Sequence, residues 1–265
     1  MTGALRLVDS IGARTAALVL YAFDLVILTG LALSRCWRLR PVERDISVRQ
    51  ILFTGVHALP FTALLALLTA LVVVVQAQLQ VSGNGDQALL GQVLVVILVR
   101  EFGPLMVALV VVSRSGAAIA TELASMVASR ETEAMEWSGI RLVDYLVLPR
   151  LIGMCVALVC LTLLFIAAAL VAGFILSVVL VPGAPSLARF SETLATNLAP
   201  SDGLILLAKT VVPGLLAAGI ACREGLSCRP VPTEVPRAAT RAVVRAIATV
   251  FVWDTAVTAF SYALR

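Results

Sequence analysis

The stretch LVVILVREFGPLMVALVVV, residues 94–112, decides how this chain folds. Two apolar runs, Leu94–Val99 and Leu105–Val112, enclose an adjacent cation and anion, Arg100 and Glu101. Runs of this length and hydropathy predict a membrane-spanning helix. A charged side chain near a bilayer centre costs about 2.5–3.5 kcal/mol, and such residues usually face a bundle interior, a wet cavity or a partner charge. We therefore expect a functional site inside the membrane at this pair.

The rest of the chain has the same character. Its 265 residues are 60% hydrophobic and 14% charged, with a mean hydropathy of +1.03. This composition predicts an all-α polytopic membrane protein and excludes a water-soluble domain. Five segments are long and apolar enough to span a bilayer: 55–79, 89–112, 145–181, 203–222 and 241–262. Residues 1–265 contain no visible internal repeat, and we therefore expect one domain.

The third of these segments is too long to span a bilayer as a straight helix parallel to the membrane normal. At 1.5 Å per residue, a helix over 145–181 is about 54 Å long, against a hydrocarbon core of about 30 Å. It must therefore tilt, bend or project beyond the membrane.

A sixth apolar run, residues 15–33, is broken by Asp24 and has arginines on both sides. Because basic residues favour the cytoplasmic side, both ends of this run are expected there. That favours an interfacial or re-entrant elbow helix within an N-terminal segment 1–50 over a full span. No small-residue cleavage site follows the run, so a signal peptide is not expected.

The arginines also predict the orientation. The segments 113–144 and 223–240 are rich in arginine, whereas the opposite loops, 80–88 and 182–202, hold only Arg189. The N-terminus is therefore expected inside and the C-terminus outside. This placement explains the net charge of +4 without a nucleic-acid partner. The spacing of the five cysteines indicates neither a metal site nor a disulfide framework.

Four charged residues lie in or near predicted spans: Arg100, Glu101, Lys209, which is the only lysine, and Asp254. Two cations and two anions neutralise one another if three helices converge. The cluster could line a functional cavity, or it could be a structural set of ion pairs or residues that snorkel to water. Adjacent residues of a helix point about 100° apart. Arg100 and Glu101 are therefore expected to face different partners.

The segment 113–144 is charged and rich in helix-forming residues, above all between Thr121 and Glu136. Its pattern fits either a solvated surface helix or a helix that docks on a soluble partner. The chain has no G-x-x-x-x-G-K-[ST] motif, and its only lysine lies inside a span. If ATP drives its activity, another polypeptide must therefore bind and hydrolyse the ATP.

Together these residues resemble the MlaE (YrbE-type) permeases of lipid-transporting ABC systems, from about residue 48 to the C-terminus. The most specific match is Arg100-Glu101-Phe102-Gly103-Pro104, where the family typically has R-E-L-G-P. Further matches are Arg114, Gly116, Glu122, Met126, Met135-Glu136, Pro149-Arg150, the run Arg237–Val244 and Asp254, with Lys209 where a close relative also carries lysine.

The resemblance implies a homodimeric permease of the bacterial inner membrane. Its partners would be two cytoplasmic ATPase subunits, which bind ATP and Mg²⁺, and a periplasmic MCE-domain protein. The chain itself would be neither an enzyme nor a cofactor-binding protein. An outward-open cavity at the dimer interface would hold phospholipid.

The resemblance also implies roles for particular residues. Within 113–144, a coupling helix would dock on the ATPase through Glu122, Met126, Arg130, Glu131, Met135 and Glu136. The lipid cavity would be lined by Arg100, Glu101, Lys209 and Asp254, with Gln76 and Gln78 near its mouth and Leu71 and Val75 facing the acyl chains.

Some positions depart from the family pattern. Ser129-Arg130-Glu131 stands where the family has a T-E-Q-like sequence, which reverses a charge, and Pro236 stands where it has glycine. The span 55–79 also lacks the glycines that the family often has between its equivalents of Gly55 and Gln76, which would narrow the cavity. A sterol, a fatty acid or another hydrophobic molecule is therefore an alternative cargo. An ion-coupled secondary carrier and a non-transporting scaffold for an MCE complex are the alternative functions.

Overall fold

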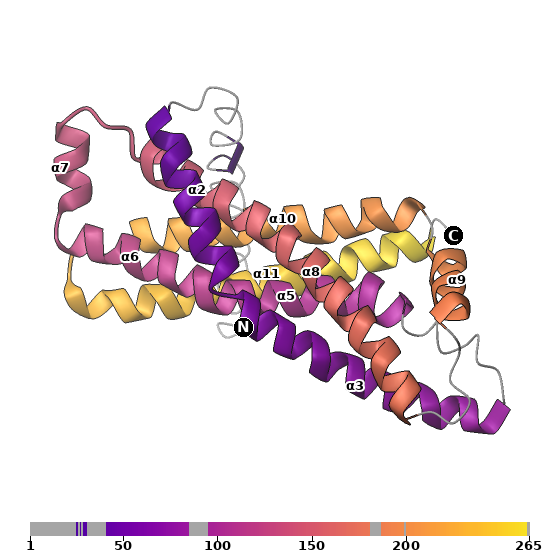
Figure 1. The fold of residues 1–265 in the computed structure, drawn as a ribbon. Coiled ribbons are helices and arrows are strands. Elements are labelled where there is room, and N and C mark those ends of the chain that lie inside the picture. The colour runs from indigo at the N-terminus through magenta and orange to yellow at the C-terminus, as the bar shows by residue number, and fades with distance from the viewer. Residues whose placement is uncertain are drawn as a thin grey trace, which may run out of the picture.

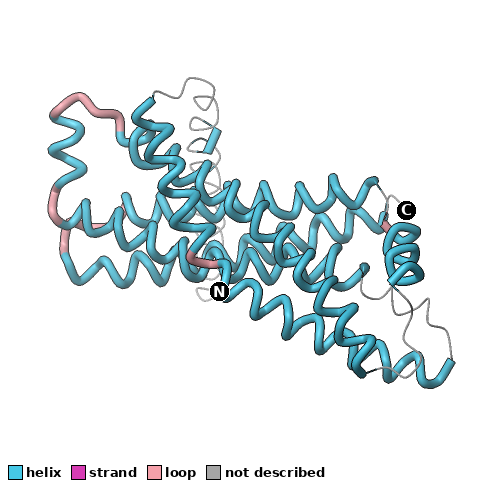
Figure 2. The backbone as a smooth tube through the Cα atoms, in the orientation of Figure 1, coloured by secondary structure: helices cyan, strands magenta, loops and turns pink. Residues whose placement is uncertain are grey.

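The computed structural model describes residues 25, 27, 29, 30, 41–84, 95–180, 187–198 and 200–263. Within these ranges the chain forms helices joined by short loops, and no strand (Figure 2). Among the described residues, five helical segments are long and apolar enough to cross a membrane: Asp45–Gln76, Ile97–Ala128, Val143–Val179, Ser201–Leu226 and Pro232–Ala263. The predicted class, an all-α polytopic membrane protein with five spans, is confirmed.

The first span consists of two helices, α2 (Pro41–Val56) and α3 (Leu59–Asn84), which meet at a turn. It begins earlier than the predicted 55–79, because α2 packs along α8 (Leu148–Leu180). A Cβ added at Gly153 of α8 would lie 2.8 Å from the Cβ of Gln50, so the missing side chain permits this close approach. The last ten residues of the predicted interfacial segment 1–50 thus belong to α2.

The earlier apolar run, residues 15–33, lies mostly outside the described residues. Of its described residues, Leu25 and Thr29 approach α10 (Pro200–Leu226). A Cβ at Gly219 would meet their side chains at 3.0 and 2.8 Å. Part of the N-terminal segment therefore packs against α10. Its placement in the membrane interface stays a prediction.

The second span runs without a break from the π-helix η2 (Val95–Phe102) through α5 (Gly103–Val111) and the π-helix η3 (Val112–Gly116) to α6 (Ala117–Ala128). The prediction of a loop from residue 113 differs from the structure here. Ile119 and Leu123 are buried, and α6 packs against α10 and α11 (Val235–Ala263). The only charged residue of α6, Glu122, lies on its exposed face, and the opposite face is buried in the bundle.

The segment after α6 turns sharply. Arg130 adopts the left-handed conformation, with φ of 61°, and separates α6 from the short helix α7 (Glu131–Trp137). The π-helix η4 (Val143–Val147) then leads into α8. The observed third span, Val143–Val179, agrees with the predicted 145–181. In Figure 1, α8 runs obliquely across the other helices, as its length requires.

The remaining elements complete the bundle. Helix α9 (Leu187–Asn197) precedes α10, and the short 3₁₀ helix η5 (Pro232–Glu234) precedes α11. Figure 1 shows α9 and the C-terminal end of α11 at one end of the bundle and α7 at the other. The arginine distribution predicts that the α7 end is cytoplasmic and the α9 end is the outer side.

Small residues allow the spans to pack closely. Ala218 and Cys222 on α10, and Ala242 and Ala246 on α11, are each at most 1% exposed. Small side chains of this kind let helix backbones approach within a membrane.

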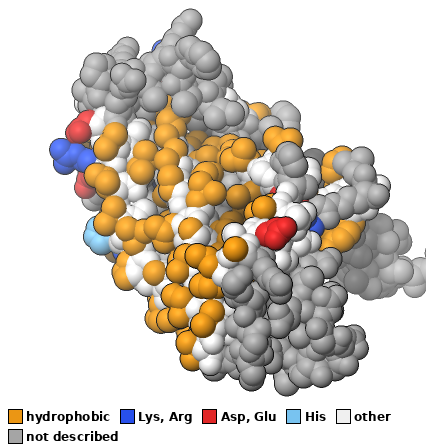
Figure 3. All heavy atoms as spheres, turned by 45° about the vertical axis from the view of Figure 1, so that its right-hand side comes forward, with side chains coloured by type: hydrophobic (Ala, Val, Ile, Leu, Met, Phe, Trp, Pro, Cys, Tyr) orange, Lys and Arg blue, Asp and Glu red, His pale blue; other side chains and the backbone are white. Residues whose placement is uncertain are grey.

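The outer surface of the bundle is largely apolar. Figure 3 shows hydrophobic side chains that form a broad area with few charged groups, as expected of a face that contacts lipid.

Candidate functional site

Lys209 is the centre of a polar cluster that joins three spans. Its side chain is 1% exposed, and its Nζ donates hydrogen bonds to Glu101 Oε2 at 2.8 Å and to Thr258 Oγ1 at 2.6 Å. A third bond goes to the backbone carbonyl oxygen of Arg100 at 2.9 Å. Asp254 Oδ1 lies 3.4 Å from the same nitrogen. Because an ammonium group has three N–H donors, these acceptors satisfy Lys209 completely.

Local sequence explains why the Arg100 carbonyl is available. In an α-helix this oxygen would accept from the N–H four residues later, which is Pro104, and proline has no N–H. The helix is π-helical up to Phe102, and Lys209 from α10 donates to the carbonyl instead. Gly103 is required beside it, because an added Cβ would overlap the Leu98 carbonyl oxygen. The motif Arg100–Pro104 therefore shapes the backbone as well as supplying charges.

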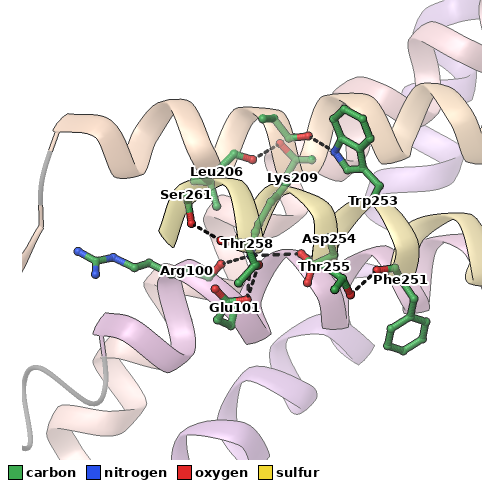
Figure 4. A network of polar contacts seen from close by, with 12 residues as sticks. Arg100, Glu101, Leu206, Lys209, Phe251, Trp253, Asp254, Thr255, Thr258 and Ser261 are labelled. Atoms are coloured by element: carbon green, nitrogen blue, oxygen red, sulfur yellow. Dashed lines mark hydrogen bonds and ion pairs between the residues drawn. The ribbon is translucent and has the colours of Figure 1, made fainter. Parts of the chain in front are cut away.

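Two residues of α11 contribute to the cluster from one face. Asp254 and Thr258 are four residues apart and so point the same way. Thr258 also donates to Glu101 Oε2 at 3.0 Å, which holds that carboxylate from two sides. The indole Nε1 of Trp253 donates to the carbonyl of Ala208 at 2.9 Å and ties α11 to α10 next to the cluster. Figure 4 shows Glu101, Asp254 and Thr258 around Lys209, with Trp253 directed to the α10 backbone beside them.

Arg100 has a separate partner. Its Nη2 donates to Asp202 Oδ2 at 2.8 Å and to the backbone oxygen of Asn197 at 3.0 Å. Asp202 lies in the first turn of α10, and its side chain is 3% exposed. In Figure 4 the Arg100 side chain points away from Lys209. Of the four charges predicted to gather, three therefore meet around one ammonium group, while Arg100 contributes its carbonyl and directs its guanidinium elsewhere.

Thr258 and Asp202 were not among the predicted site residues. The four-residue spacing from Asp254 was a signal that could have identified Thr258. Asp202 was assigned to an outer loop, 182–202, immediately before the predicted fourth span. Nothing in the sequence indicates that this loop residue reaches the helix that carries Arg100.

The other predicted cavity residues lie on α3. Leu71, Val75 and Gln76 are exposed on this helix, and the side chain of Gln78 lies outside the described residues. Within the described part of the chain, no hydrogen bond or ion pair joins Gln76 to the Lys209 cluster. Helix α3 does pack against η2, which carries Glu101. Helix α3 thus lies beside the charged segment, and its residues Leu71, Val75 and Gln76 stay exposed.

The predicted coupling residues fall on two helices rather than one. Glu122 and Met126 belong to α6, the continuation of the second span. Glu122 Oε1 lies 2.9 Å from Nη2 of the buried Arg150, which ties α6 to α8. These contacts assign Glu122 and Met126 to the bundle, because Met126 also packs against its core.

The remaining coupling residues lie in and around α7. Arg130 forms the turn before it, while Glu131 and Glu136 are exposed on it and Met135 packs inward. Two apolar residues outside the predicted coupling set are more exposed than these. Trp137 is 91% exposed at the end of α7, and Ile140 follows at 42%.

Comparison with known proteins gives a family for this arrangement. Residues 47–260 match the family described as Permease MlaE. A probable ABC transporter permease protein of Rickettsia felis is 29% identical over 240 residues, which cover 91% of this chain and 92% of the relative. A similar protein of Rickettsia prowazekii is 30% identical over 204 residues, covering 77% of this chain and 78% of the relative.

A chloroplast protein is also similar. Protein TRIGALACTOSYLDIACYLGLYCEROL 1 of Arabidopsis thaliana is 26% identical over 216 residues, covering 82% of this chain and 61% of the relative. The family match includes all three spans that meet at Lys209. This chain belongs to the MlaE permease family, and with five apolar helices in its described part it is a multi-pass ABC transporter permease.

Proposed function

We propose that this chain is the membrane subunit of an ABC transporter that moves phospholipid between the bacterial inner membrane and a periplasmic MCE-domain protein. Its main support is the cluster of Glu101, Lys209 and Asp254, which sets charged groups within an apolar bundle. A phospholipid needs both kinds of environment, a polar site for its headgroup and apolar surface for its acyl chains. The Arabidopsis relative carries the name of a glycolipid, which agrees with a lipid cargo.

The apolar surface lies on α3. Leu64, Leu68, Leu71 and Val75 follow the i, i+4, i+7 spacing of one helix face, and each is between 39% and 51% exposed. In a dimer of two copies, this face and η2 would line a cavity for acyl chains. Gln76 would then lie close to the mouth of that cavity.

Energy would come from a separate ATPase docked at the α7 end. Helix α7 extends from that end of the bundle (Figure 1), and Trp137 offers a large exposed side chain beside the acidic residues Glu131, Glu133 and Glu136. Exposed aromatic residues are common anchors of protein interfaces. Movement of α7 would pass to the lipid site through α6, which continues directly into the helix of Glu101.

The test is ATP-dependent lipid transfer by the reconstituted complex. The chain is co-expressed with the ATPase encoded beside its gene, placed in vesicles with fluorescent phospholipid, and mixed with the MCE protein as acceptor. We expect transfer that requires ATP and that falls strongly in Lys209→Ala, with Glu192→Gln on the exposed side of α9 as control. Transport driven by an ion gradient without the ATPase would instead establish a secondary carrier.

A further inference from the structure

The Lys209 cluster carries one negative charge too many. Glu101 and Asp254 supply two carboxylates to a single ammonium group. The neighbouring pair of Arg100 and Asp202 is neutral by itself and adds nothing to this sum. An unbalanced charge inside a membrane protein is costly. A cationic group that enters the site would remove that cost.

The cluster also has acceptor atoms to offer. Lys209 uses all three of its N–H groups. Glu101 Oε2 is occupied by Lys209 and Thr258, but no described residue donates a hydrogen bond to Glu101 Oε1 or to Asp254 Oδ2. The side chains of Glu101 and Asp254 are 32% and 14% exposed, in contrast to 1% for Lys209. The open side of the cluster therefore presents carboxylate oxygens rather than the ammonium.

The position of the cluster suits a headgroup that enters from the α9 end. Lys209 is nine residues from the first residue of α10 and Asp254 is nine from the last residue of α11. At 1.5 Å per residue both lie about 14 Å below that end of the bundle. Phe102, next to Glu101, is 43% exposed and adds apolar surface beside the site.

We propose that this cluster selects phospholipids whose headgroup carries a primary ammonium, such as ethanolamine phospholipids, over anionic phospholipids such as those with a glycerol headgroup. The inference rests on the proposed lipid-transport function. The ammonium brings the single positive charge that the site lacks, and its N–H groups can donate to Glu101 Oε1 and Asp254 Oδ2. Both headgroups carry a phosphate anion, but only the ethanolamine headgroup also carries an ammonium, so the glycerol headgroup brings no positive charge to the two carboxylates.

The experiment measures headgroup preference in the assembled transporter. The permease–ATPase complex is reconstituted in vesicles that contain equal amounts of ethanolamine and glycerol phospholipids with identical acyl chains. Mass spectrometry then gives the headgroup ratio of the lipid transferred to the MCE protein, and separately that of the lipid that co-purifies with the complex. We expect the unaltered complex to favour the ethanolamine lipid several-fold.

Substitution of either carboxylate should remove the headgroup preference. Glu101→Gln and Asp254→Asn each make the cluster neutral, and either should reduce the ratio to near one. Glu192→Gln, a carboxamide substitution outside the cluster, should leave the ratio unchanged. The two cluster variants test the same prediction independently, so that poor folding of one leaves the other informative.

The outcomes separate this inference from the proposed function. Equal transfer of both lipids by the unaltered complex, or an undiminished preference in both cluster variants, overturns the selectivity while lipid transport stands. Absence of any ATP-dependent transfer overturns both.

Discussion

The Lys209 ammonium on α10 lies 2.8 Å from the Glu101 carboxylate on η2. The two residues are 108 positions apart in the sequence, and their ion pair joins two spans. Its geometry is not that of a surface ion pair, because Lys209 is almost fully buried. Its loss would leave Glu101 and Asp254 without their cation.

Lys209→Met should therefore destabilise the permease severely. Removal of one partner of a buried ion pair typically costs about 3–5 kcal/mol, since the remaining charge keeps its desolvation penalty. The triple variant Lys209→Met, Glu101→Gln, Asp254→Asn removes all three charges and should recover part of that stability. Thermal unfolding of the purified protein in detergent gives the comparison. A single variant as stable as the unaltered chain would contradict the ion-pair interpretation.

Asp202→Asn should also lower the unfolding temperature, because it leaves the Arg100 guanidinium without its carboxylate partner. Asp45→Asn is the matched control. Asp45 pairs with Arg49 at 3.1 Å, but these side chains are 65% and 80% exposed, so the surrounding solvent screens the pair. Equal effects of the two substitutions, measured in parallel melts, would show that burial does not determine the strength of the Arg100 contact.

Gly103→Ala should disturb the backbone beneath the cluster. An added Cβ would overlap the Leu98 carbonyl oxygen and lie 3.2 Å from Ile166 Cγ1 on α8. Overpacking of this kind costs about 1–3 kcal/mol. Gly203→Ala on α10 is the control, since nothing lies within 4 Å of its added Cβ. The prediction is wrong if both variants melt at the temperature of the unaltered protein.

The sequence predicts the spans well because hydropathy over about 20 residues depends on the bilayer rather than on tertiary contacts. The predicted end of the second span at Val112 is too early, because the helix continues to Ala128. Ser113, Arg114 and Ser115 interrupt the apolar run there, and only the packing of α6 against α10 and α11 shows that the helix continues into the bundle.

The charged residues also divide into those that the sequence alone identifies and those that only the tertiary structure identifies. Lys209 and Asp254 could be selected from single spans, since an ionisable residue in an apolar run is conspicuous by itself. The partner of Arg100 could not, because Asp202 is separated from it by 102 residues and lies at a helix end. Only the packing of α10 on η2 brings these two together.

Cys228 should react slowly with thiol reagents. It is 8% exposed in the loop after α10, and its Sγ lies 3.7 Å from the carbonyl oxygen of Ala124. Burial raises the pKa of the Cys228 thiol, although Arg241 opposes the shift. Because only the thiolate is the nucleophile, labelling should be slow at neutral pH and accelerate as the pH rises beyond the ordinary thiol pKa.

A variant that keeps Cys228 as its only cysteine allows this labelling to be followed by mass spectrometry. Arg241→Gln removes the group that lowers the pKa of the thiol and should slow the reaction further at a given pH. Urea-unfolded protein supplies the rate of an unprotected thiol. Labelling of the folded chain at that same rate would be inconsistent with a buried Cys228.

Trp137→Ala should separate ATPase coupling from folding. The side chain is 91% exposed at the end of α7, and substitution of such a residue usually changes stability by less than about 0.5 kcal/mol. An aromatic anchor in an interface, in contrast, commonly contributes about 2 kcal/mol or more to binding. We therefore expect an unchanged melting temperature together with weaker ATPase binding and lower ATPase stimulation.

The control for this variant is Leu187→Ala on α9, an apolar side chain that is 64% exposed at the other end of the bundle. It should leave ATPase binding intact, because the proposed docking surface is confined to the α7 end. Deletion of Glu131–Trp137 should abolish the stimulation, and binding by co-purification is the direct readout. If Trp137→Ala and the deletion both retain full binding, the ATPase docks elsewhere, and the exposed tryptophan needs a different partner.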